Sequence, residues 1–347
     1  MFTKTHTRIG LAAVAAIFSL GAHAANVAFD PFGNSGANPA QTFQVNSLDW
    51  LPDNALAIAA LSTPAYAGGP GGVAGQKVGE SYIRTVAQGT LGTLGTTVGS
   101  IGTTFFNGFT TQSTFGREFT FQTSFYEFGT SIGSSTASFR LAPGANFFKV
   151  YADTSKNSDM IAGSGYGDGT LILEGTLTQL SGSFTDKTLT ANDLDFGKTT
   201  LLDGFNSDNQ NGVKTHIGQG SNKILVDVTS LNPAYFLGNI AQIVLTLDYS
   251  DTSNLNAPFI SANPSNQVVG VTPSYTVVGT DKINGAPCTA SGGKDENGNQ
   301  LGRCDFHFQS DASGSFQLSV VPEPGSLALI GVALAGLGFA TRKRKSV

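Results

Sequence analysis

The chain has 347 residues, of which 12% are charged, and its formal net charge is −5. It contains 44 glycines and 25 phenylalanines, a composition too apolar for a disordered chain and too rich in Gly, Thr and Phe for a helical one. The acidic balance argues against nucleic acid as a partner. Composition therefore predicts an all-β protein.

Residues 1–24 have the features of a secretory signal peptide. Two basic residues precede a short apolar stretch, and the stretch ends in Ala-His-Ala, a small-residue cleavage site. We therefore expect cleavage between Ala24 and Ala25, so that the exported region begins at Ala25.

Residues 25–116 are rich in glycine, with GGPGGVAGQ at 68–76 and the near-repeat GTLGTLGTTVGSIGTT at 89–104. Glycine weakens strand interiors and marks bends, so this region is predicted to form short strands and loops. The GPGGVA stretch neither follows a convincing strand nor opens a helix, and it is therefore no evidence of a dinucleotide site.

Alternation of apolar and polar residues is much clearer further along the chain. The exported region, 25–320, is therefore expected to form an antiparallel β-sandwich, jelly-roll-like or similar. Strands are predicted at 119–128, in two runs of 137–153 around a PGAN turn, and at 170–185, 222–230, 241–251 and 313–321.

The two cysteines, Cys288 and Cys304, flank a turn-rich stretch in the exported region. In an oxidising compartment a disulfide between them is expected. Closing a loop of about 15 residues stabilises a protein by about 3 kcal/mol in the chain-entropy model. A zinc site needs closer Cys or His spacing than this chain offers.

Candidates for catalysis are few. The exported region contains two histidines: His216 lies in a turn-rich stretch, and His307 lies on a predicted strand, where it should face solvent or a cross-strand neighbour. GTSIG at 129–133 matches the nucleophile-elbow pattern around Ser131, but a strand-like sequence follows where the elbow requires a helix. Trp50, the single tryptophan, belongs to no aromatic motif for sugar stacking. No catalytic residue is assigned.

Acidic and amide side chains cluster in DGFNSDNQNG at 203–212. Asp203, Asn206 and Asp208 are weak candidates for a calcium site, since calcium takes six to eight oxygen ligands. The stretch lacks the spacing and the closing glutamate of an EF-hand loop, and ordinary Asx turns explain it. We predict neither a metal nor a cofactor.

Residues 321–347 have three parts: a Pro-Glu-Pro stretch, an apolar segment at 327–340, and a basic cluster. As a helix the apolar segment spans about 21 Å, against about 30 Å of hydrocarbon. A transient inner-membrane anchor is therefore expected, with the basic cluster on the cytoplasmic side. The prolines disfavour regular structure ahead of it and leave an accessible peptide. The basic cluster comprises Arg342, Lys343, Arg344 and Lys345.

The same residues resemble the PEP-CTERM sorting signal. The motif consists of Val321, Pro322, Glu323 and Pro324, followed by Gly-Ser, the apolar run and the basic end. This resemblance implies recognition and cleavage by an exosortase in a Gram-negative bacterium that makes extracellular polysaccharide. It also implies delivery to the cell surface or the extracellular matrix.

A second resemblance covers about 115–250. The segments FTFQTSFYEF, NFFKVYADTSKNSDMIAGSGYGDGTLILEGTL and HIGQGSNKILVDV are similar to the flocculation-associated PEP-CTERM proteins. That resemblance implies a structural role in binding cells and exopolysaccharide into flocs or biofilm, with no active site to carry over.

Three functions follow as hypotheses. The first is a non-enzymatic surface or matrix protein associated with extracellular polysaccharide. The alternatives are a secreted polysaccharide-acting hydrolase, for which paired carboxylates leave no local sequence signature, and a calcium-dependent carbohydrate-binding module.

Overall fold

The structure is a computed structural model. It describes residues 26–58, 60, 65–96, 98–107, 110–131, 136–160, 162–186, 218–250, 267–272 and 305–317.

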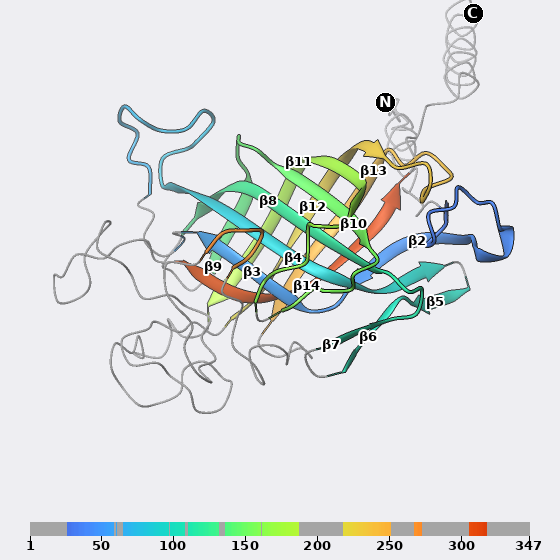
Figure 1. The fold of residues 1–347 in the computed structure, drawn as a ribbon. Helices are drawn as coiled ribbons and strands as arrows, with labels where there is room; N and C mark the ends of the chain where they lie inside the picture. The colour runs from blue at the N-terminus through green and yellow to red at the C-terminus, as the bar shows by residue number, and fades with distance from the viewer. Residues whose placement is uncertain are drawn as a thin grey trace, which may run out of the picture. The chain divides into compact units, whose positions relative to one another are not determined.

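Fourteen strands and one short 3-10 helix, η1, make up the secondary structure of these residues (Figure 1). The first seven strands are β1 (Val27–Phe29), β2 (Phe43–Trp50), β3 (Asp53–Ile58), β4 (Glu80–Thr96), β5 (Gly99–Gly102), β6 (Thr104–Asn107) and β7 (Thr110–Ser113). The others are β8 (Glu118–Thr130), β9 (Thr136–Leu141), β10 (Phe147–Asp153), β11 (Thr170–Asp186), β12 (Gly218–Leu231), β13 (Gln242–Ser250) and β14 (Phe306–Gln317); η1 is Pro39–Gln41. The predicted all-β class is confirmed.

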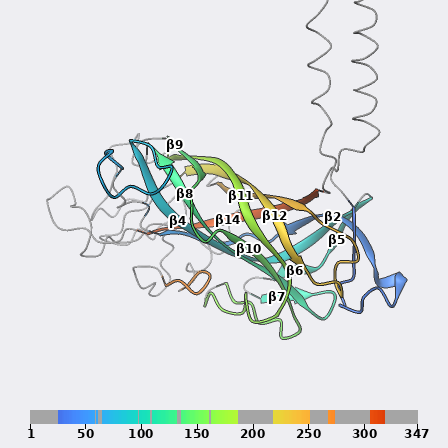
Figure 2. The ribbon, with the colours of Figure 1, turned by 90° about the horizontal axis from the view of Figure 1, so that it is seen from above.

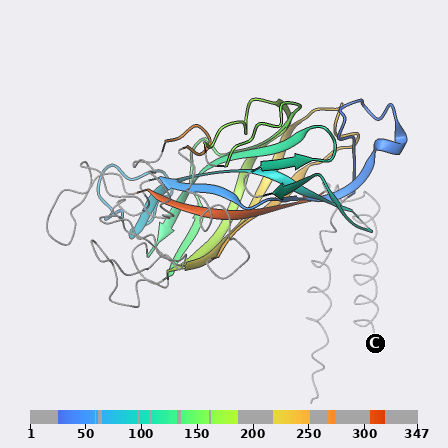
Figure 3. The same ribbon diagram turned by 60° about the horizontal axis from the view of Figure 1, so that its bottom comes forward.

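All strands except the β6–β7 hairpin belong to one antiparallel sheet that closes on itself. Strands β3 and β2 each pair with β4 on one side and with β14 on the other. From β14 the hydrogen bonding continues through β13 and β12 to β11. Strands β10 and β9 then each pair with β11 on one side and with β8 on the other. Strand β8 pairs with β4 over eleven register positions and completes the circuit. Figure 2 shows β4 beside β8, and Figure 3 shows β14 (red) beside the blue strands β2 and β3. The two halves of the sheet therefore face each other across one core.

Phenylalanine and aliphatic side chains fill the space inside the closed sheet. Trp50 of β2 is 2% exposed and packs edge-on against Phe121 of β8, with ring centroids 4.8 Å apart, and against Phe148 of β10 at 6.4 Å. Fully burying one such side chain contributes about 1.5–3 kcal/mol. These side chains belong to one large cluster of buried apolar residues inside the sheet.

The predicted strands agree with the structure where apolar and polar residues alternate. Strands β8 to β13 lie at the positions expected, and the PGAN turn separates β9 from β10. The final strand, β14, begins at Phe306, seven residues before the predicted start at 313.

The prediction for the glycine-rich region is wrong at β4. This strand has 17 residues, runs through GTLGTLGT and pairs with β2, β3, β5 and β8. A Cβ atom at Gly89 would lie 2.6 Å from the ring of Phe121, and one at Gly92 would lie 2.9 Å from Leu51. The glycines therefore make room for neighbouring side chains, and they do not break the strand.

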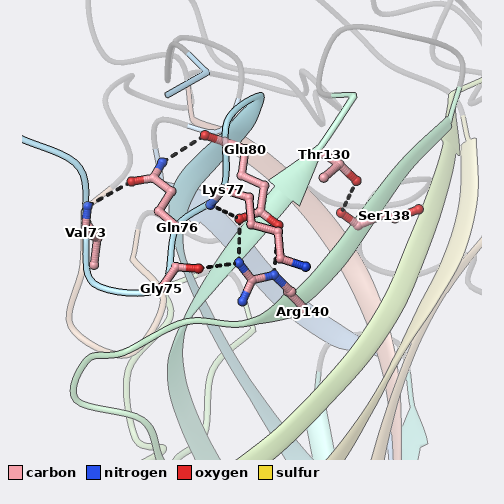
Figure 4. A network of polar contacts seen from close by, with 8 residues as sticks. All are labelled: Val73, Gly75, Gln76, Lys77, Glu80, Thr130, Ser138 and Arg140. Atoms are coloured by element: carbon pink, nitrogen blue, oxygen red, sulfur yellow. Dashed lines mark hydrogen bonds and ion pairs between the residues drawn. The ribbon is translucent and has the colours of Figure 1, made fainter. Parts of the chain in front are cut away.

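The loop before β4 is fixed by an ion pair between Glu80 and Arg140 (Figure 4). Arg140 Nε donates to Glu80 Oε1 at 2.8 Å, and its Nη2 donates to the carbonyl of Gly75 at 2.7 Å. The hydrogen bond from Arg140 lowers the pKa of Glu80. The guanidinium lies 4.4 Å from the ring centre of Phe128. GPGGVA thus belongs to an anchored loop.

Candidate functional site

A groove crosses the outer face of β13, β14, β2, β4 and β5. Cross-strand pairing places its side chains in two adjacent rows. The first row contains Thr246, Ser313, Asp49 and Thr93, and the second contains Val244, Ser315, Ser47, Gly95 and Ser100.

The groove exists because these outward-facing residues are small. Its volume is 390 Å³. At Gly95 an added Cβ would lie 2.0 Å from Ser47 Oγ, so this position has no room for a larger residue. Each of the five strands thus contributes at least one hydroxyl group to the groove, beside apolar lining such as Val244.

Hydroxyl groups both donate and accept hydrogen bonds. Thr93 Oγ1 donates to Asp49 Oδ2 at 3.1 Å, which orients the carboxylate. The lining contains one carboxylate and no basic residue. Such a surface suits a neutral ligand with many hydroxyl groups better than an anionic one.

Next to the two rows of the groove lies a third row, and its residues on β13 and β14 are acidic. Asp248 of β13 lies directly opposite Asp311 of β14. Burial, together with the nearby charges of Asp49 and Asp248, raises the pKa of Asp311 to about 6. Adjacent carboxylates repel one another and any anionic polymer, so the outer face carries negative charge here.

A separate polar cluster lies buried on the outer face of β3, beneath residues 157–160 and 162–166. Tyr166 Oη donates to Asp53 Oδ2 at 2.5 Å, and Asn54 Nδ2 donates to the carbonyl of Met160 at 3.0 Å. Burial raises the pKa of Asp53 to about 7 despite the hydrogen bond from Tyr166. The cluster is closed to solvent, so it serves to hold the segment on the sheet.

His307 belongs to this buried cluster. Its side chain is 0% exposed, and its Nε2 lies 3.0 Å from Oδ1 of Asn54 on the adjacent strand. The expected contact with a cross-strand neighbour is therefore confirmed, and the alternative of solvent exposure is wrong. Burial lowers the pKa of His307 to about 3, so the imidazole is neutral at ordinary pH.

Ser131, the residue of the elbow pattern, follows the last residue of β8 with a φ of 59°. The next described element is strand β9, which begins at Thr136, whereas an elbow requires a helix after the nucleophile. Trp50 is buried in the core, so it offers no surface for sugar stacking.

Several predicted residues lie outside the described residues. These are the cleavage pair Ala24 and Ala25, the cysteines Cys288 and Cys304, His216, the calcium candidates Asp203, Asn206 and Asp208, and all of 321–347. Within the described ranges, no three His, Cys, Asp or Glu side chains are grouped to hold a metal ion. No helix in the described part of the chain is long and apolar enough to cross a membrane.

No pattern in the sequence predicted the groove. Its residues come from segments far apart in the sequence, and each is an ordinary serine, threonine or glycine on an outward-facing strand position. The SGS stretch at 313–315 was the available signal, because two serines two residues apart on a strand share one face.

Fold and groove together define an all-β protein with a hydroxyl-lined outer groove. Residues 320–345 match the family model of the PEP-CTERM protein-sorting motif. This match indicates an exported, surface-directed protein that an exosortase sorts, as in Gram-negative bacteria. The comparisons with curated proteins and with solved structures found no match.

Proposed function

We propose that the protein is a non-enzymatic component of the cell surface or extracellular matrix, that it associates with exopolysaccharide, and that it promotes floc or biofilm formation. The observation that carries the proposal is the groove of serine and threonine hydroxyls on a chain with a sorting motif. A polysaccharide strand presents many hydroxyl groups, and each can exchange hydrogen bonds with this lining.

The acidic residues beside the groove narrow the choice of polymer. Asp49, Asp248 and Asp311 give this face a negative potential, and electrostatic complementarity controls which partners are rejected. A neutral polysaccharide is therefore the proposed ligand, and an acidic one should bind weakly.

Blocking the groove tests this assignment. In Ser313→Trp the indole should fill the groove, so that retention on immobilised neutral polysaccharide falls at least tenfold while the fold persists. Affinity electrophoresis of the purified exported region, with circular dichroism for the fold, measures both effects. Ser138→Trp on β9 is the matched control, since Ser138 is exposed and outside the groove. Unchanged retention in Ser313→Trp would contradict the proposal.

Processing at the C-terminus is the second part of the proposal. The apolar segment 327–340 anchors the protein transiently in the inner membrane until exosortase cleaves near Pro322-Glu323-Pro324. Deleting 322–347 should release the β domain into the medium, folded, and should abolish clumping of the cells. Clumping at the level of the intact protein would refute the matrix role. Intact-mass measurement with and without exosortase fixes both mature ends.

We also propose that Cys288 and Cys304 form a disulfide in the exported protein. The same intact-mass measurement, made before and after reduction and alkylation, tests this pairing.

A polysaccharide-acting hydrolase is the second candidate. It is favoured by the neighbouring carboxyl groups of Asp248 and Asp311, because a carboxyl of raised pKa beside a second carboxyl is a common pair in glycosidases. These groups lie on the same face of adjacent strands and do not face each other across the groove, which favours binding without cleavage. Release of reducing ends by the intact protein, lost in Asp311→Asn, would favour the hydrolase.

A further inference from the structure

Three buried side chains meet inside the closed sheet, on the face opposite the groove. Thr85 of β4 donates through Oγ1 to Glu127 Oε1 at 2.7 Å. Asn222 of β12 places Nδ2 3.5 Å from Glu127 Oε2. Both oxygens of one carboxyl group on β8 therefore contact a hydroxyl on one side and an amide on the other.

This trio is shielded from water. Thr85 is 1% exposed, and Glu127 and Asn222 are each 3% exposed. Their register partners are largely apolar or small: Ala57 and Phe125 beside Thr85, and Gly182 and Leu247 beside Asn222.

The amide of Asn222 is held tightly but incompletely satisfied. A Cβ at Gly182 would lie 1.6 Å from Asn222 Oδ1, so the amide packs directly against the backbone of β11. Oδ1 nevertheless has no hydrogen-bond partner. An unpaired buried carbonyl oxygen is unfavourable, so this arrangement calls for a chemical explanation.

Burial raises the pKa of Glu127 to about 7, and no charged neighbour contributes to the shift. The carboxyl group therefore holds its proton in mildly acidic and near-neutral surroundings. A protonated carboxyl accepts a hydrogen bond on one oxygen and donates one from the other. Thr85 and Asn222 both donate to this carboxyl group. The carboxyl can therefore take the hydroxyl proton on one oxygen and give up its own proton from the other once attack on the amide carbon has made the nitrogen basic.

We propose that Thr85 Oγ1 and Asn222 Cγ become joined by an intramolecular ester bond, with Glu127 transferring the protons. Thr85 Oγ1 attacks the amide carbon while its proton passes to Glu127 Oε1. The proton of Glu127 Oε2 passes to the amide nitrogen, the Cγ–Nδ2 bond breaks, and ammonia leaves. Glu127 ends in its starting protonation state, so the step needs neither an oxidant nor a co-reactant.

Two physical effects favour this step. Holding the hydroxyl and the amide against one carboxyl makes the reaction unimolecular. An acid placed to give and take protons contributes about 10²–10⁴-fold in rate. The bond would link β4 to β12, which are separated in the closed sheet by β3 and β2, β14 and β13. It would brace the two halves of the sheet across the core.

Peptide mapping of the protein purified from its own host tests the proposal. Trypsin should cleave after Arg84, Arg117, Lys214 and Lys223. We expect peptides 85–117 and 215–223 to appear joined, with the mass of one ammonia lost and fragment ions that place the link at Thr85 and Asn222.

Three variants locate the chemistry. Thr85→Val and Glu127→Gln should each yield the two peptides separately, whereas Thr85→Ser, which keeps the hydroxyl, should yield them joined. If a variant fails to fold, the peptide map of the unaltered protein still shows whether the ester bond between Thr85 and Asn222 is present. Separate 85–117 and 215–223 peptides from that protein would overturn the proposal, including when ammonia is lost from Asn222 alone as a succinimide.

Discussion

Replacing Trp50 by alanine is expected to lower the free energy of unfolding by about 3–5 kcal/mol. The side chain is 2% exposed, lies opposite Leu91 of β4, and contacts Phe121 and Phe148 from the far side of the core. Truncation leaves a cavity lined by strands that are fixed in a closed sheet, so the walls cannot collapse to fill it.

Trp50→Phe is the matched control. It keeps an aromatic ring against Phe121 and Phe148 and removes the indole Nε1, which is buried without a hydrogen-bond partner. We expect a loss of about 1 kcal/mol, because relief of that unpaired group offsets part of the lost packing. Urea unfolding followed by circular dichroism measures both variants. Equal stability losses in the two variants would contradict this account of the core.

The stability of the protein should fall as pH rises from about 4 to about 7. Burial raises the pKa of Asp53 from 3.8 to about 7 and that of Glu127 from 4.5 to about 7. The lower value of each pair is the pKa in the unfolded state, and the higher value is the pKa in the folded state. At a pH between the two, the folded state binds more protons than the unfolded state, so raising the pH favours unfolding. His307 acts in the opposite direction: its pKa falls from 6.5 to about 3, and acid therefore destabilises the fold over that range.

Asp53→Asn isolates one of these carboxyl groups. The asparagine keeps an oxygen for the hydrogen bond from the backbone of Asn54, and it cannot ionise. Relative to the natural protein, the variant should gain stability between pH 4 and pH 7, by on the order of 3 kcal/mol. Denaturant unfolding at several pH values measures this difference.

Tyr166→Phe provides a second comparison. The hydroxyl of Tyr166 donates to Asp53 and opposes the rise in its pKa, so its removal should extend the pH-dependent range of stability upward. Parallel stability curves for the natural protein and Asp53→Asn from pH 4 to pH 7 would show that Asp53 does not titrate as inferred.

Local sequence patterns predicted the regular part of this fold. In β8 the sequence FTFQTSF places Phe119, Phe121 and Phe125 on the core face, and this alternation is legible in a single segment. The turn-forming residues of PGAN, at 143–146, correctly predicted the break between β9 and β10. Such features depend on neighbours within a few residues, so one sequence carries them.

The start of β14 could not be predicted in the same way. His307 and Gln309 are buried polar residues on its outer side, while Phe306 and Phe308 are partly exposed. A polar residue normally marks a solvent-facing position. Here the amide of Asn54 in the same polar cluster donates a hydrogen bond to the carbonyl of Met160, and this contact joins segments 106 residues apart in the chain.

The sequence by itself determined the β class, the alternating strands, and the sorting motif at 320–345, because each is written in contiguous residues. Only the tertiary structure decided that the sheet closes through β4 and β8, that glycines in β4 make room for Phe121 and Leu51, and that serines and threonines of five strands line one groove. The physical reason is that cross-strand register brings together residues far apart in the chain. Small residues have little local preference, and their role depends on the side chains that fill the space beside them.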